Sequence, residues 1–155
     1  MEKAQMKLYS IKSESNGYQL TTKSESNFIV KTDLSQKAGG KGEGASSIEL
    51  FLASLAGCEN VTAQLIAQNL GFTIFQSSFD IKGERDDRGL NHTPITEDSP
   101  FTSRLTRIWG TVYIDTDGTD EQINQLNYIL KKRCPLARMV IDSGCKLEIE
   151  WKKLD

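Results

Sequence analysis

The sequence predicts a single α+β domain, and three observations lead to that prediction. Short segments that alternate apolar and polar residues, as half-buried strands do, open and close the chain. Between them lies one long apolar segment with helix-start and helix-stop residues, and a second helical segment precedes the last strand. The chain has 155 residues, the usual size of one domain. We therefore expect residues 1–155 to form one domain.

Composition argues against several classes of function. The 19 basic and 21 acidic residues give a net charge of -2, which argues against a dedicated nucleic-acid or anionic-membrane surface. No apolar run approaches the roughly 20 residues that span a bilayer, and residues 1–5 lack the features of a signal peptide. Three cysteines are too few for a disulfide-stabilised secreted scaffold. The expectation is a cytoplasmic protein with no nucleic-acid or membrane partner.

The first third of the chain is predicted to form three short antiparallel strands, at 6–12, 18–22 and 28–32. Asn16-Gly17 between the first two is a hairpin turn signal, because both residues tolerate positive φ. A glycine-rich segment at 35–46 follows, and its glycine spacing matches neither the phosphate-binding nor the dinucleotide-binding motif. We interpret it as a flexible connection.

Residues 45–70 are predicted to form the central helix. Ser46 and Ser47 suit a helix start, Glu49 places negative charge in the first turn, and Gly71 suits the helix end. The segment 48–58 is apolar on nearly every face, which predicts a helix that is buried all round or nearly so.

The rest of the chain is predicted to continue with strands and two helices. In order, we expect a strand at 72–83 with a bulge near 77–78, a long mobile loop at 84–103, a strand at 105–114, a helix capped by Thr119 or Asp120 and running to 132, a second helical stretch at 134–142, and a closing strand at 145–151.

Cys134 precedes a proline, and that pair has a physical meaning. Proline favours the first position of a helix, so Pro135 places Cys134 at the helix cap, next to free amides. Basic residues 131–133 precede it and Arg138 follows. Such surroundings stabilise a thiolate, so the sequence predicts a lowered pKa for Cys134.

Cys58 lies in the middle of the apolar helix, where two readings stay open. Free cysteine often packs in cores as a small hydrophobic side chain. Ala56 and Gly57 are small, however, and leave space for a neighbouring group or a substrate.

The segment 48–58 that ends at Cys58, followed later by Cys134-Pro135-Leu136, resembles the OsmC/Ohr family of osmotically induced and organic hydroperoxide resistance proteins. The resemblance implies an OsmC-like fold, with antiparallel sheets packed around a buried central helix. It also implies an intertwined homodimer with active sites at the subunit interface.

The resemblance further implies a function in oxidative-stress defence, as a thiol-dependent peroxidase. Cys58 takes the place of the cysteine that attacks an organic hydroperoxide and becomes a sulfenic acid. Cys134 takes the place of the resolving cysteine, which forms a disulfide that a dithiol reductant reopens. These steps need no metal or organic cofactor.

The sequence departs from the hydroperoxide reductases at the residues that activate the first cysteine. Those enzymes use an N-terminal arginine held by a glutamate ten residues before that cysteine. Here Glu49 stands nine residues before Cys58, nearly opposite it on a helix, so we expect Glu49 to cap the helix instead. The N-terminal loop has no arginine, and the sequence does not select among the substitute cations Lys41, Arg85, Arg88 and Arg104.

These departures leave a second function open. The alternative is a non-catalytic OsmC-like protein that binds a small apolar or thiol-containing molecule in the interfacial pocket. A cation near Cys58 would favour the enzyme. The single histidine, His92, is expected to be a solvated loop residue, and Cys145 a structural residue at a strand start.

Overall fold

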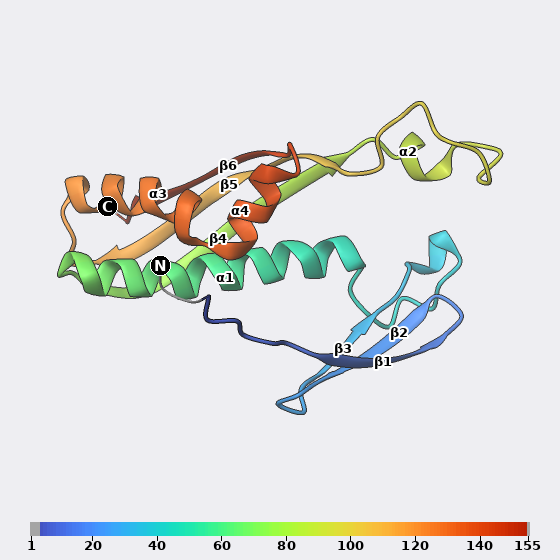
Figure 1. Cartoon of the computed structure of the whole chain (residues 1–155), viewed down its shortest axis with the longest axis horizontal. Coiled ribbons are helices and arrows are strands. Elements are labelled where there is room, and N and C mark those ends of the chain that lie inside the picture. The colour runs from blue at the N-terminus through green and yellow to red at the C-terminus, as the bar shows by residue number, and fades with distance from the viewer. Residues whose placement is uncertain (1–3, 155) are drawn as a thin grey trace. The chain divides into compact units, whose positions relative to one another are not determined.

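The described residues of the computed structural model, 4–154, divide into two units, Met1–Phe51 and Leu52–Asp155. Their secondary structure is α+β, as the sequence predicts. Figure 1 labels the elements, and each unit is described separately below.

Three strands in the first unit pair antiparallel in the order β1-β2-β3 (blue in Figure 1). They are β1 (Ile11–Asn16), β2 (Gln19–Ser24) and β3 (Ile29–Thr32). The predicted first strand, 6–12, is wrong in position. Asn16 pairs directly with Gln19 across a tight turn with Gly17 at φ 61°, so the first strand continues up to that turn instead of ending before it.

The glycine-rich segment after β3 is held by one buried side chain, Asp33. Its carboxylate accepts the backbone N–H groups of Leu34 at 2.8 Å and of Lys41 and Glu43 at 3.2 Å each. A short 3-10 helix, η1 (Gln36–Ala38), lies within the segment. A side chain at Gly40 would approach the carbonyl oxygen of Leu34 to 2.1 Å, so glycine is required there. The segment is therefore a loop, as predicted, but one with its own hydrogen-bonded order.

The second unit contains a three-stranded sheet in the order β4-β5-β6. β4 (Ile74–Arg85) pairs antiparallel with β5 (Leu105–Thr116), which pairs parallel with β6 (Lys146–Lys153). Parallel neighbours need a crossover connection, and α3 (Asp120–Arg133) followed by α4 (Pro135–Asp142) supplies it. In Figure 1 the two helices follow one another along the sheet, with α3 at the left of the view and α4 nearer the middle of the strands.

Two details of the predicted strands and loop need correction. The register of β4 and β5 shifts between Ile74 and Gln76 and between Glu84 and Arg85, whereas residues 77–78, the expected bulge, pair regularly. The 84–103 segment is not all loop, because β4 extends to Arg85 and a short helix, α2 (Arg88–Asn91), follows.

The central helix, α1 (Ser47–Leu70), begins as predicted. The Ser46 hydroxyl accepts the Glu49 N–H at 3.2 Å, and the Glu49 carboxylate accepts the Ser46 N–H at 2.7 Å. This reciprocal pair is a capping box, and it confirms the capping role expected of Glu49.

In the single chain α1 is not buried all round: in the segment 48–58, for which such burial is expected, Leu55 alone is fully buried. Its buried residues lie along one stripe, and on another side Val61 and Leu65 are 61% and 57% exposed. The buried stripe packs against the sheet and against α3 and α4, because it contributes to a core with side chains from β5, β6 and both helices. The buried residues of α1 are Leu55, Glu59, Ala63, Ile66 and Ala67.

The hydropathy of α1 differs from the expectation that no apolar run approaches the length needed to span a bilayer. Within residues 4–154 it is the one helix long and apolar enough to cross a membrane by length and composition, with a mean hydropathy of 1.3. Core helices of soluble proteins have the same properties, and the part of α1 in the second unit contributes a stripe of side chains to the core of that unit.

Candidate functional site

The two cysteines singled out by the sequence meet in the second unit. Cys58 lies half-buried in the middle of α1, and Cys134 lies fully buried between α3 and α4. The S–H of Cys134 donates a hydrogen bond to the sulfur of Cys58, with 3.3 Å between the two sulfur atoms. In Figure 1 the junction of α3 and α4 lies beside the middle of α1. The expectation that these cysteines are neighbours is confirmed.

The local sequence explains how Cys134 reaches this position. Its N–H donates the last helical hydrogen bond of α3, to the carbonyl of Leu130 at 2.9 Å. Pro135 then occupies the first turn of α4, with Cys134 in an extended conformation as its N-cap. One residue thus ends one helix and begins the next, and the turn brings its sulfur against α1.

The predicted lowering of the Cys134 pKa is wrong in direction. Burial of the fully enclosed thiol raises its pKa from an ordinary 9.0 to about 11. The N–H of Ala137 acts in the opposite direction, as a helix-cap amide should, but burial outweighs it. The hydrogen bond to Cys58 and the electrostatic interactions with Cys58 and Glu59 raise the pKa further. Cys134 is therefore a protonated thiol at neutral pH.

Sequence reasoning missed a third member of the site, Glu59. This carboxyl is only 3% exposed, and it accepts a hydrogen bond from the indole N–H of Trp151 at 3.1 Å. Burial raises the pKa of Glu59, while the Trp151 hydrogen bond and the charge of Lys131 lower it. A signal was present in the sequence, because Glu59 stands four residues from both Leu55 and Ala63 on the core-facing stripe of the helix.

Trp151 holds this hydrogen bond in a fixed place on β6. Its ring is 2% exposed and packs edge-to-face on Phe79, with 5.4 Å between ring centroids. Its backbone N–H and C=O both bond to the side chain of Asn127 at 2.9 Å. The donor to Glu59 is therefore fixed by contacts on both the main chain and the ring.

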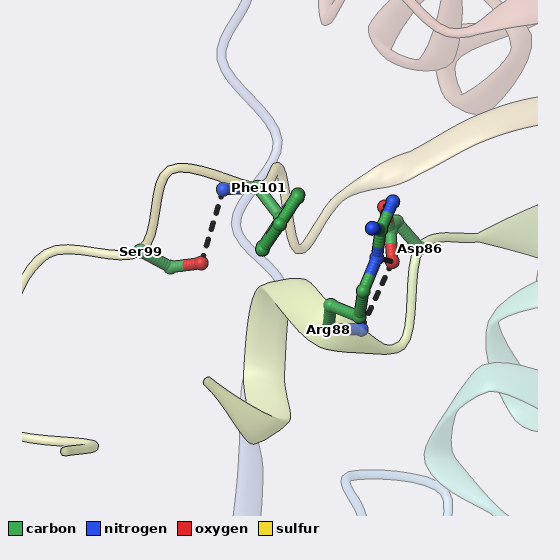
Figure 2. A network of polar contacts seen from close by, with 4 residues as sticks. All are labelled: Asp86, Arg88, Ser99 and Phe101. Atoms are coloured by element: carbon green, nitrogen blue, oxygen red, sulfur yellow. Dashed lines mark hydrogen bonds and ion pairs between the residues drawn. The ribbon is translucent and has the colours of Figure 1, made fainter. Parts of the chain in front are cut away.

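The candidate cations of the second unit are engaged elsewhere. Arg88 pairs with Asp86 at 2.7 Å and lies 4.0 Å from the ring centroid of Phe101 (Figure 2). Arg85 pairs with Asp87 at 2.8 Å. Within residues 52–154, no lysine or arginine forms a hydrogen bond with the Cys58 sulfur.

The remaining residues named from the sequence lie apart from the thiol pair. Cys145 is buried just before β6, where burial raises its pKa and the charge of Arg104 lowers it. His92 is half-buried rather than solvated, and its ring lies edge-on to Phe101 with centroids 6.0 Å apart. Lys41 belongs to the first unit, where its backbone N–H bonds to Asp33.

Comparison with known proteins places this arrangement in a family. A family model described as OsmC-like protein matches residues 40–150. No curated protein matches the sequence.

Solved structures share the fold at low sequence identity. An OsmC-like protein from Mycoplasma pneumoniae is 22% identical with a TM-score of 0.77, covering 96% of this chain and 99% of that one. An organic hydroperoxide resistance protein from Legionella pneumophila is 13% identical with a TM-score of 0.70, covering 96% and 99%. A putative organic hydroperoxide resistance protein from Vibrio cholerae, with captopril bound in one of its active sites, is 15% identical with a TM-score of 0.68, covering 97% and 93%. These similarities establish the fold.

Proposed function

The chain belongs to the OsmC-like protein family, and on that premise we propose that it reduces organic hydroperoxides through the thiol pair Cys58 and Cys134. Its structural relatives include organic hydroperoxide resistance proteins, which supports a role in stress defence. The observation that carries the proposal is the direct contact of the two sulfur atoms at 3.3 Å. A disulfide needs about 2.05 Å between sulfurs, so a small movement suffices to join them.

The proposed reaction has two steps on the protein. The Cys58 thiolate attacks the O–O bond of the hydroperoxide; an S–O bond forms, the O–O bond breaks, and the alkoxide leaves as an alcohol after taking a proton. Cys134 then attacks the sulfenic acid of Cys58; the S–S bond forms, the S–O bond breaks, and the hydroxyl leaves as water with the thiol proton. A dithiol reductant reopens the disulfide. Neither step uses a metal or an organic cofactor.

We also propose the molecular setting. The protein acts in the cytoplasm, where a reducing environment returns the disulfide to two thiols. Residues 1–155 serve as one OsmC-like domain, because the family match at 40–150 includes parts of both units. Two copies form a homodimer, which the exposed apolar side chains of α1 and the first sheet support.

The test is single-turnover reduction of cumene hydroperoxide, with dimedone to trap the sulfenic acid. Cys58→Ser should abolish peroxide consumption, because no sulfur remains to attack oxygen. Cys134→Ser should complete one turnover and then stall, with dimedone attached at Cys58. Cys145→Ser is the control and should behave as the wild type. Mild oxidation of the wild type should give a Cys58–Cys134 disulfide in peptide mapping, with Cys145 free.

Different results would assign the roles differently. Dimedone at Cys134 instead of Cys58 would reverse the two roles, and a dominant disulfide through Cys145 would contradict the pairing. If the wild type consumes peroxide no faster than a free thiol, the enzymatic proposal fails.

A second candidate function is binding of a small apolar or thiol-containing molecule without catalysis. Two observations favour keeping it. Within residues 52–154 no lysine or arginine donates a hydrogen bond to the Cys58 sulfur, which would be the direct way to stabilise the charge that develops in peroxide attack. One structural relative holds captopril in an active site. Retained ligand binding in the Cys58→Ser variant, with no peroxide turnover in the wild type, would support this function.

A further inference from the structure

The two sulfur atoms of the thiol pair differ in how far they can be reached from solvent. Cys134 is 0% exposed, whereas Cys58 is partly exposed. The residues that share the core with Cys134 on either side of it are buried too. Leu130, one turn earlier in α3, is 2% exposed, and Ala137, in the first turn of α4, is 0% exposed. A molecule from solvent therefore meets the pair at Cys58.

This difference matters once the pair is oxidised, because a disulfide can be opened at either of its sulfurs. The thiolate of a reductant approaches in line with the S–S bond, from the side opposite the sulfur that leaves. Attack on Cys58 uses its exposed side, whereas attack on Cys134 would come through the core in which Cys134 is packed. The fold thus leaves one of the two directions open.

We propose that the reductant attacks the sulfur of Cys58, so that the disulfide opens with the reductant joined to Cys58 and with Cys134 as the leaving group. A bond forms between the reductant sulfur and the Cys58 sulfur, the bond between Cys58 and Cys134 breaks, and Cys134 takes a proton to become a thiol. This inference deepens the proposed function: it rests on the redox pair of that proposal, but not on the identity of the oxidant.

The chemistry of the leaving group, taken alone, favours the opposite direction. Burial raises the pKa of Cys134 to about 11, and a thiol of high pKa leaves more slowly than one of ordinary pKa. Leaving ability changes only the rate of an attack that can occur, whereas a sulfur that no thiolate reaches is not attacked. The N–H of Ala137, which lowers the pKa of Cys134, also offers the departing sulfur a hydrogen bond. Access therefore decides the direction.

The closeness of the two sulfurs then selects the class of reductant. Cys134 stays beside Cys58 after it leaves, since the sulfurs of the reduced pair lie 3.3 Å apart. It can attack Cys58 again and expel a monothiol, which restores the starting disulfide. A dithiol escapes this reversal, because its second thiol attacks its own sulfur in the mixed disulfide, forms a cyclic disulfide and releases Cys58 as a thiolate. The two thiols of the reductant are oxidised as the pair is reduced.

The test locates the mixed disulfide that a monothiol leaves on the protein. Diamide, which oxidises thiols without peroxidase activity, first forms the Cys58–Cys134 disulfide in Cys145→Ser. Excess glutathione is added, samples are quenched with acid over time, and peptic peptides are mapped by mass spectrometry at low pH. Glutathione on Cys58 should exceed glutathione on Cys134 at least about tenfold, because exchange requires access to the attacked sulfur. The matched control is the same disulfide in concentrated urea, where both sulfurs are exposed and both should carry glutathione.

Glutathione mainly on Cys134 of the folded protein would overturn the proposal, as would the same distribution in folded and unfolded protein. If Cys145→Ser does not fold, the wild type gives the same measurement, because peptide mapping separates Cys145 from the other two cysteines. Dithiothreitol should reduce the folded disulfide fully at a thiol concentration at which glutathione does not. Equal reduction by the two reagents would contradict the selection of a dithiol.

The peroxide assay separates this inference from the proposed function. A wild type without peroxide turnover, combined with glutathione on Cys58 after diamide oxidation, leaves the inference standing and removes the peroxidase. Full peroxide turnover with glutathione on Cys134 does the reverse. A protein in which diamide forms no Cys58–Cys134 disulfide would contradict both.

Discussion

Cys134 and Glu59 show how burial decides the charge state of a residue against its local sequence. The helix cap and the neighbouring basic residues favour a Cys134 thiolate, yet burial raises the pKa to about 11. The same physical cause raises the pKa of Glu59. Both groups lie in one core cluster, where water cannot solvate a charge. Burial therefore favours the neutral form of both residues.

The raised pKa of Glu59 predicts a dependence of stability on pH. Because the folded pKa lies above the ordinary value of 4.5, the folded state binds the proton more tightly than the unfolded state. That contribution to stability is complete below pH 4.5 and is lost as the pH rises through the folded pKa. Glu59→Gln has no titrating carboxyl at this position and so does not lose this stability as the pH rises. The unfolding free energy of the variant minus that of the wild type should therefore be larger at pH 8 than at pH 4.5.

Urea unfolding at the two pH values measures this difference. Glu150→Gln, which removes an exposed carboxylate, should show a smaller change between them. A Glu59→Gln variant whose relative stability is the same at both pH values would contradict the prediction.

At the scale of elements, α1 connects the core of the second unit to the thiol pair. Its stripe of buried residues packs into the same core as β5, β6, α3 and α4, and Cys58 packs against the edge of that core. Geometry at the sulfur atoms therefore depends on how well the stripe is packed. A loss of packing one turn from Cys58 should affect both stability and thiol chemistry.

Leu55→Ala tests this dependence. Leu55 is 0% exposed, and its truncation should lower the unfolding free energy by about 2–5 kcal/mol, through lost burial and a new cavity. Leu154→Ala is the control, because Leu154 is 49% exposed and its truncation should change stability by no more than about 0.5 kcal/mol. Chemical denaturation measures both. Equal effects of the two substitutions would show that the stripe of α1 does not form the core described here.

At the scale of the whole molecule, a large share of the apolar surface is exposed. In the first unit Ile11, Phe28 and Ile29 are 67%, 73% and 66% exposed. In α1 Val61 and Leu65 are 61% and 57% exposed. Asp33 is the one residue of the described part of that unit, 4–51, that is fully buried. A three-stranded sheet without a covered apolar face is marginally stable in water, so it requires a partner surface.

We predict that a second copy of the chain provides that surface. Light scattering should give about twice the chain mass of 17.3 kDa at micromolar concentration. Leu65→Glu should weaken the association, because it places a charge on the exposed apolar side of α1, whereas Leu154→Glu outside that helix should not. A monomer at all micromolar concentrations would contradict the homodimer.

The amino-acid sequence by itself indicated the order of the main helices and strands and singled out the two thiols. Ser46 and Glu49 specify a helix start through groups three residues apart, and Pro135 places Cys134 at a cap through its missing N–H. Such signals are local, so they can be read without the fold. The fold class follows from them and from the family resemblance, and the structure agrees with it. The pairing of Cys58 with Cys134 follows from the resemblance alone, and the structure places the two sulfur atoms in contact.

Only the tertiary structure decided which side of α1 is buried and in which direction the pKa of Cys134 is shifted. The apolar segment 48–58 looks the same on every face, and only packing against β5, β6, α3 and α4 selects the stripe that begins at Leu55 and continues through Glu59 to Ala67. The ionisation of Cys134 depends on groups from α1 as well as on its own helix cap. Burial is the sum of contacts from segments far apart in the chain. For that reason no local pattern predicts how deeply a group is buried or in which direction its pKa is shifted.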